Sequence, residues 1–175
     1  KINSNAPLKE LFLLIFPELK YLERLNKLSE INDLTVLDEK ILLGILLIDE
    51  TNNHEYFSHK YNISNNLKSN LNILANNFTN LNESKKFFQR DLKKNFYYLG
   101  KNHLKALNLI NYLISSKSKL QDYLKTLKII DKISLPKFPI DGNYLKDRGI
   151  KQGENIGKVL KILEKEWLSN NFKIS

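Results

Sequence analysis

The apolar residues of this chain recur three and four positions apart in most segments, and no segment alternates cleanly between apolar and polar residues. This spacing places side chains on one face of an α-helix, whereas strict alternation is typical of a half-buried strand. Leu67, Leu71, Leu74 and Phe78 form one such stripe, and Ser64 is a suitable N-cap before it. We therefore predict an all-α fold, a compact multi-helix body and tail domain, because each stripe must pack against another helix.

Further helices are expected at about residues 7–16, 17–28, 37–48, 84–99, 103–114 and 118–133, with Gly100 as a stop signal. With 175 residues the chain can bury one sizeable core. We expect a helical body over residues 1–132. Residues 133–175 should form a Pro/Gly turn, a short helix and a C-terminal helix, and the two regions should pack as one unit.

Composition excludes several classes of protein. The longest apolar run, Ile41–Ile48, is well short of the roughly 20 residues that a membrane span needs, so a buried helix is expected there. The chain has no cysteine, and therefore no disulfide framework or thiolate metal site, and no secretory signal pattern. These features fit a cytoplasmic protein. Because the chain lacks methionine and begins at Lys1, we expect a fragment or a processed product.

The net charge of +9 is concentrated in one segment. Residues 85–128 hold eleven Lys or Arg and two acids, Asp91 and Asp122, while the rest of the chain is balanced. A cationic block in an otherwise neutral protein favours contact with a polyanion such as nucleic acid. The alternative is a genome-wide excess of lysine, although such a bias should spread along the whole chain.

Four of the six glycines lie between Gly142 and Gly157. One interpretation is architectural: Gly149 ends a short helix in a left-handed cap, and Gly157 allows another backbone to approach the last helix closely. The other is functional: free N–H groups at the start of that helix, near Gly153, bind a phosphate beside Lys151 and Lys158.

The stretch KFPIDGNYLKDRGIKQGENIGKVLKILEKEW, Lys137–Trp167, resembles the C-terminal part of bacterial class II tRNA nucleotidyltransferases, the CCA-adding enzymes, and of the related poly(A) polymerases. The family pattern is close to P-x-F-P-I-x-G-x-D-L-x-x-x-G-I-x-x-G-x-x-I-G-x-x-L-x-x-L. The matching residues are Phe138, Pro139, Ile140, Gly142, Leu145, Gly149, Ile150, Gly153, Ile156, Gly157, Leu160 and Leu163. Tyr144 departs from the family, which usually has Asp there, and this indicates a diverged member.

The resemblance implies a catalytic head that this chain does not contain. The G-S loop and the D-x-D pair that holds two metal ions are absent from the sequence, as is the E-D-x-x-R element that selects CTP or ATP. Mg²⁺ and CTP or ATP are thus implied for a full-length parent enzyme and not for this chain, in which we expect no catalytic residues. The missing N-terminal head becomes an expected partner.

The resemblance also implies that this part binds tRNA through its backbone. The residues that we expect to contact RNA are basic side chains of the cationic segment and the start of the last helix: Lys85, Lys86, Arg90, Lys93, Lys94, Lys101, Lys105, Lys151, Gly153, Gly157 and Lys158. Tyr97 or Tyr98 could stack on a base, with Phe96 in the core, although packing of all three is the simpler interpretation.

Two other functions remain open. The first is the same region of a poly(A) polymerase, and the second is a helical protein-interaction module whose basic block meets an acidic protein. The histidines indicate no metal site, because His54 and His59 are five apart, His103 stands alone and none is followed by Asp.

Overall fold

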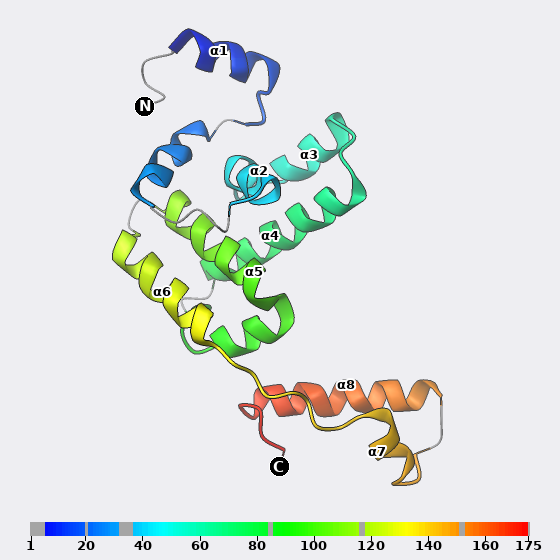
Figure 1. Cartoon of the computed structure of the whole chain (residues 1–175). Coiled ribbons are helices and arrows are strands. Elements are labelled where there is room, and N and C mark those ends of the chain that lie inside the picture. The colour runs from blue at the N-terminus through cyan, green and yellow to red at the C-terminus, as the bar shows by residue number, and fades with distance from the viewer. Residues whose placement is uncertain are drawn as a thin grey trace. The chain divides into compact units, whose positions relative to one another are not determined.

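The computed structural model describes residues 6–19, 21–31, 37–83, 86–115, 118–150 and 153–174. Every regular element within these ranges is a helix, which confirms the all-α prediction (Figure 1). The elements are α1 Ala6–Ile15, the 3₁₀ helix η2 Leu22–Glu30, α2 Glu39–Leu47, α3 Asn53–Lys60, α4 Asn65–Glu83, α5 Leu92–Ile114, α6 Leu120–Lys132, α7 Gly142–Lys146 and α8 Glu154–Ser169. No helix in the described part has the length and apolar character needed to cross a bilayer.

The chain divides into two compact units, Lys1–Ile133 and Ser134–Ser175. Each unit is described below by itself. That the two regions pack together as one unit stays a prediction.

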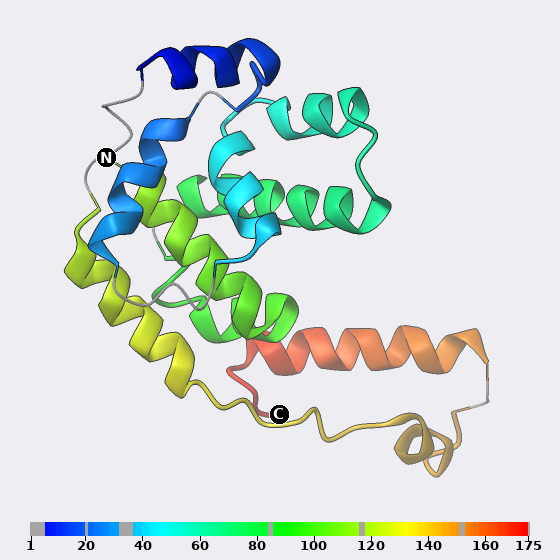
Figure 2. The ribbon, with the colours of Figure 1, turned by 45° about the horizontal axis from the view of Figure 1, so that its top comes forward.

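The core of the first unit surrounds the second half of α5. Leu104, Leu107, Leu109 and Ile110 are almost completely buried there, and α5 contacts η2, α2, α4 and α6. In both views of the ribbon α6 runs beside α5 (Figures 1 and 2). Because α5 touches so many neighbours, its direction determines where the other helices lie.

Gly100 divides α5 into two helical segments that meet at a kink. The residue has φ 76° and ψ 169°, which are not helical, and glycine adopts this backbone conformation without steric cost. The predicted stop signal is therefore confirmed, and a second helical segment follows it with Leu104, Leu107 and Ile110 buried.

The short helix α2 packs very closely against α4 and α5. Asp38 caps it by accepting a hydrogen bond of 2.9 Å from the backbone N–H of Ile41. A Cβ on Gly44 would lie 3.3 Å from Leu74 and 3.4 Å from Ile110. The buried helix expected from the apolar run is confirmed, and Gly44 is the glycine at which a neighbouring helix approaches closely.

The helix expected from Pro17 does not form as an α-helix. A turn occupies Pro17 and Glu18, and a 3₁₀ helix begins only at Leu22. Long-range bonds hold the turn: the Glu18 carboxylate accepts from Lys60 at 2.7 Å and from Tyr61 at 3.0 Å. Tertiary contacts thus override the local helical pattern.

Basic side chains of η2 bind the carboxyl ends of two other helices. Arg24 donates to the carbonyls of Ile45 and Ile48 at 2.8 and 2.7 Å, at the end of α2. Lys27 donates to the carbonyl of Ser115 at 2.8 Å, at the end of α5. Cations are stabilising where helix carbonyls lack partners, so these two residues join η2 to the core.

The helix expected over residues 84–99 was wrong in its first described residues and is confirmed from Leu92 onward. Residues 86–91 form a turn, and α5 begins at Leu92. The Asn95 amide donates to the carbonyl of Phe87 at 3.0 Å, and the Phe87 ring is buried. The turn conformation therefore accompanies burial of the Phe87 ring in the core.

The second unit contains α7, α8 and a cluster of aromatic rings at the C-terminal end of α8. Trp167 is buried and contacts Phe138 and Phe172, with ring centroids 5.3 and 4.9 Å apart. The left-handed cap expected at Gly149 is confirmed by its φ of 84°, and the N–H of Ile150 closes the motif on the carbonyl of Leu145 at 3.1 Å.

Asp141 and Tyr144 both act at α7. The Asp141 carboxylate accepts a bond of 2.9 Å from the backbone N–H of Tyr144 and so caps the helix. The Tyr144 ring lies 3.6 Å from the guanidinium of Arg148. Tyr144 therefore contacts Arg148, and the carboxylate that caps α7 comes from Asp141.

The shifted pKa of Glu18 lets us predict how the free energy of unfolding depends on pH. Burial raises the pKa of Glu18, but the bonds from Lys60 and Tyr61 outweigh it and the net shift is downward. A lowered folded-state pKa contributes stability at neutral pH that is lost as pH falls through about 4 and below. We expect Glu18→Gln to cost about 1–2 kcal/mol at pH 7 and progressively less on acidification.

Urea unfolding at pH 7 and pH 3.5 checks this expectation. Glu10→Gln, on an exposed carboxylate of α1, is the matched control and should change little at either pH. An equal loss for Glu18→Gln at both pH values would show that the carboxylate charge is not what stabilises the turn.

Candidate functional site

The predicted RNA-binding residues are divided between the two compact units of the chain. Lys85 and Lys151 lie outside the described residues. The remaining residues separate into an exposed group at the start of α5, a pair beside α6, and a group at the start of α8.

The exposed group is formed by the turn before α5 and the first turns of that helix. Lys86, Arg90, Lys93 and Lys94 are all exposed. Among the described residues, Arg90, Lys93 and Lys94 make no ion pair. The turn that replaced the expected helix therefore presents cations to solvent.

An exposed aromatic ring lies beside these cations. Tyr98 follows Lys94 by one helical turn, is 56% exposed and contacts the ring of Tyr97 edge-on at 5.8 Å between centroids. Residues four apart on a helix are neighbours on its surface. Phe96 packs against the core, as expected. We call Arg90, Lys93, Lys94 and Tyr98 the cationic turn surface.

Lys101 and Lys105 have a structural partner. Their ammonium groups lie 2.9 and 2.7 Å from Oδ1 of Asp131 in α6. Hydrogen bonds from Lys101 and then from Lys105 hold the pKa of Asp131 below its usual range. Two of the predicted RNA contacts thus link α5 to α6, and any contact they make with RNA stays a prediction.

The start of α8 combines glycine with basic charge. Gly153 precedes the helix with φ 132°, which favours glycine, and both Gly157 and Lys158 are exposed. Among the described residues, no atom would lie within 4 Å of a Cβ on Gly157. Close approach by another backbone, one of the two expected reasons for this glycine, is therefore not found in the described part of the second unit.

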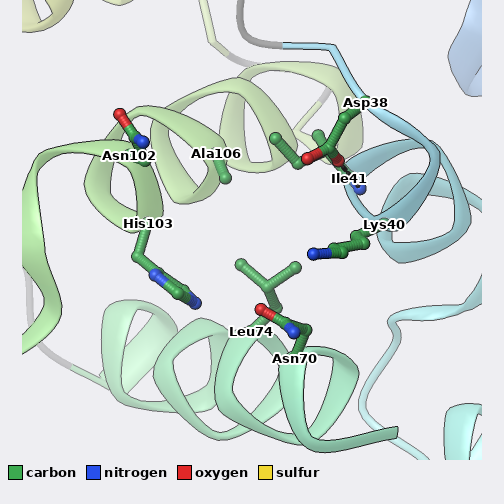
Figure 3. Close-up of a pocket in the computed structure, with 8 residues that line it drawn as sticks. All are labelled: Asp38, Lys40, Ile41, Asn70, Leu74, Asn102, His103 and Ala106. Carbon is green, nitrogen blue, oxygen red and sulfur yellow. Dashed lines mark hydrogen bonds between the residues drawn. The ribbon is translucent and has the colours of Figure 1, made fainter. Parts of the chain in front are cut away.

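A polar hollow of about 250 Å³ lies between the start of α2, α4 and α5 (Figure 3). The side chains of Lys40, Asn70 and His103 point toward its centre, while Asn102 points away. The Asp38 carboxylate is nearby and already caps α2. No signal in the sequence indicated this hollow, because its residues come from three separate segments. The hollow is lined by an acidic residue, Asp38, and a basic residue, Lys40. Its described lining residues do not combine a nucleophilic hydroxyl with a general base.

The residues described do not fit the Mg²⁺ that the resemblance implies for a catalytic head. Within the described ranges, no group of three or more His, Asp or Glu side chains could hold a metal ion. The cationic turn surface is the strongest candidate for function.

Comparison with known proteins adds no relative: no protein-family model, no curated protein and no solved structure matches the chain.

The open space around Gly157 predicts an effect on stability. Glycine in a helix is less favourable than alanine by roughly 0.5–1 kcal/mol, and here the added methyl meets no atom. We expect Gly157→Ala to raise the free energy of unfolding by that amount in thermal or urea unfolding. Gly153→Ala should lower it, because φ 132° is strained for alanine. Loss of stability in Gly157→Ala would indicate that this glycine is packed against something.

Proposed function

We propose that this chain is the C-terminal RNA-binding part of a tRNA nucleotidyltransferase that adds CCA to tRNA 3′ ends. Two independent features support the proposal. One is the resemblance of Lys137–Trp167 to that family. The other, which carries the RNA-binding part of the proposal, is the exposure of Arg90, Lys93 and Lys94 without an ion pair in the described structure.

These cations suit the sugar-phosphate backbone. Three unpaired charges within five residues would each neutralise a phosphate and release counterions, which makes affinity fall steeply with salt. The exposed ring of Tyr98 beside Lys94 offers a face on which an unpaired base could stack. Recognition of this kind depends on the shape of folded RNA more than on base edges, as binding to tRNA requires.

The start of α8 would provide a second contact. Backbone N–H groups at a helix N-terminus favour a phosphate, and the exposed Lys158 lies within the first turns of α8. An exposed Gly157 with no Cβ would let a phosphate approach the backbone closely. This would explain a glycine that costs the helix stability and fills no packing role in its own unit.

The catalytic half of such an enzyme would need a surface on which to pack, and α1 offers one. Leu11, Leu14 and Ile15 are 53%, 79% and 55% exposed. Their spacing of three and four puts them on one face. A large exposed apolar stripe is typical of a surface that another protein segment covers. We therefore assign the head's contact to α1 and the RNA contact to the cationic turn surface.

Charge reversal tests the RNA surface. Lys93→Glu with Lys94→Glu should weaken tRNA binding at least tenfold and reduce the slope of log affinity against log salt by about 2, because two phosphate contacts are lost. The measurement is fluorescence anisotropy with labelled tRNA and with double-stranded RNA of equal length across a salt series. Circular dichroism should show unchanged helicity, since both side chains are exposed.

The matched control is Lys125→Glu with Lys128→Glu, which makes the same change of charge on exposed residues of α6. It should leave most of the affinity and slope intact. Equal losses in both double variants would mean that net charge, and not the cationic turn surface, decides binding. Absence of any preference for tRNA over duplex RNA would count against the tRNA enzyme.

A further inference from the structure

Helix α6 has two apolar sides, although one side is enough to hold it in the fold. Its inner side is buried: Tyr123 stacks on Tyr112 of α5 with ring centroids 5.3 Å apart, and the Asn108 amide donates to the carbonyl of Tyr123 at 3.0 Å. Ile130 is completely buried. These contacts hold the inner side of α6 against α5. None of them involves the opposite side of the helix.

That opposite side exposes both apolar and basic residues. Leu124 is 39% and Ile129 44% exposed, and they flank a row of three exposed lysines. We define the outer face of α6 as Gln121, Leu124, Lys125, Lys128, Ile129 and Lys132. These six residues line a hollow of about 440 Å³. The aliphatic stems of the lysines cover apolar surface while their charges reach solvent.

A second hollow, of about 410 Å³, continues from the first and shares Lys125 and Ile129 with it. It lies against the turn before α5, where Phe87 and Phe88 pack edge-on with ring centroids 5.1 Å apart. Leu81 of α4 contributes to the same wall. The two hollows together give a groove along α6 with an apolar floor of aliphatic and aromatic side chains.

The charge along this groove has one dominant sign. Lys125, Lys128 and Lys132 make no ion pair within the described part of the chain. Asp131 of α6 is already paired with two lysines of α5 and is not available to these three lysines. Among the described side chains, Asp122 is the single carboxylate that lines the second hollow. An occupant with several carboxylates would therefore be attracted.

RNA matches this groove poorly. Phosphates would satisfy the lysines, but ribose and phosphate groups would leave Leu124 and Ile129 against polar surface. An amphipathic helix satisfies both features, since apolar residues three and four apart enter the groove while acidic residues beside them meet the lysines. Charge complementarity of this kind sets orientation and association rate.

We propose that the outer face of α6 binds an acidic amphipathic helix of a partner protein. Apolar side chains of that helix pack between Leu124 and Ile129, and its carboxylates pair with Lys125, Lys128 and Lys132. The outer face of α6 would bind protein, whereas the cationic turn surface would bind RNA. Both belong to the same basic segment of the sequence.

The test uses a labelled synthetic peptide of roughly 18 residues, long enough to form a helix, with leucines three and four apart and glutamates beside them. A second peptide replaces each glutamate by glutamine, and a third is poly-glutamate without leucine. Anisotropy with the whole chain should give a Kd of about 1–100 μM for the first peptide, and binding at least tenfold weaker for the other two.

Variants then locate the site. Ile129→Ser should lower the affinity for the first peptide about tenfold. The bound peptide would bury the Ile129 side chain, and serine would lose most of that apolar contact. Lys125→Glu with Lys128→Glu should weaken it by more and flatten its salt dependence. Ile162→Ser on α8, where the isoleucine is 64% exposed, is the matched apolar control and should change nothing.

Three results would overturn the proposal. The first is an acidic amphipathic peptide that binds no better than poly-glutamate. The second is a normal affinity in Ile129→Ser. The third is a loss of tRNA affinity, in the α6 charge variant, as large as in Lys93→Glu with Lys94→Glu, since the lysines of the outer face of α6 would then act through net charge and not as part of a peptide site.

Discussion

Burial of the second half of α5 is the constraint on which the first unit depends. Leu104, Leu107 and Ile110 are almost fully buried in the centre of the core, and η2, α2, α4 and α6 are placed by their contacts with this one helix. The bend at Gly100 matters for the same reason, because it sets the direction of the buried half relative to the turn that precedes α5. The cationic turn surface and the outer face of α6 are carried by, or lie beside, this helix.

Charge in this protein serves two different purposes. One group of basic residues is structural: Arg24 and Lys27 bind the carboxyl ends of α2 and α5, Lys60 neutralises the buried Glu18, and Lys101 joins Lys105 around Asp131. The other group lies exposed at the cationic turn surface and along the outer face of α6. A net charge of +9 therefore overstates what is available to a partner, and the location of each charge decides its use.

Local signals predicted some helix ends correctly, but they failed where contacts between distant segments decide the conformation. Ser64 caps α4 through a bond of 3.3 Å to the N–H of Leu67, and Gly149 adopts its left-handed cap. Both features depend on residues within a few positions of each other. Residues 86–91 form a turn and not the expected helix because burial of Phe87 and the bond from Asn95 to its carbonyl outweigh local helix propensity. The spacing of apolar residues carries no information on this competition.

The sequence by itself determined the helical class, most of the caps and the place of the basic segment, because these follow from residue type and short spacing. Tertiary structure alone decided which lysines are neutralised and which apolar residues stay exposed. Lys101 meets an acid thirty residues later, and Ile129 differs from Ile130 only in which side of α6 faces the core. Such outcomes depend on contacts between distant segments, and these exist only once the helices have packed around α5.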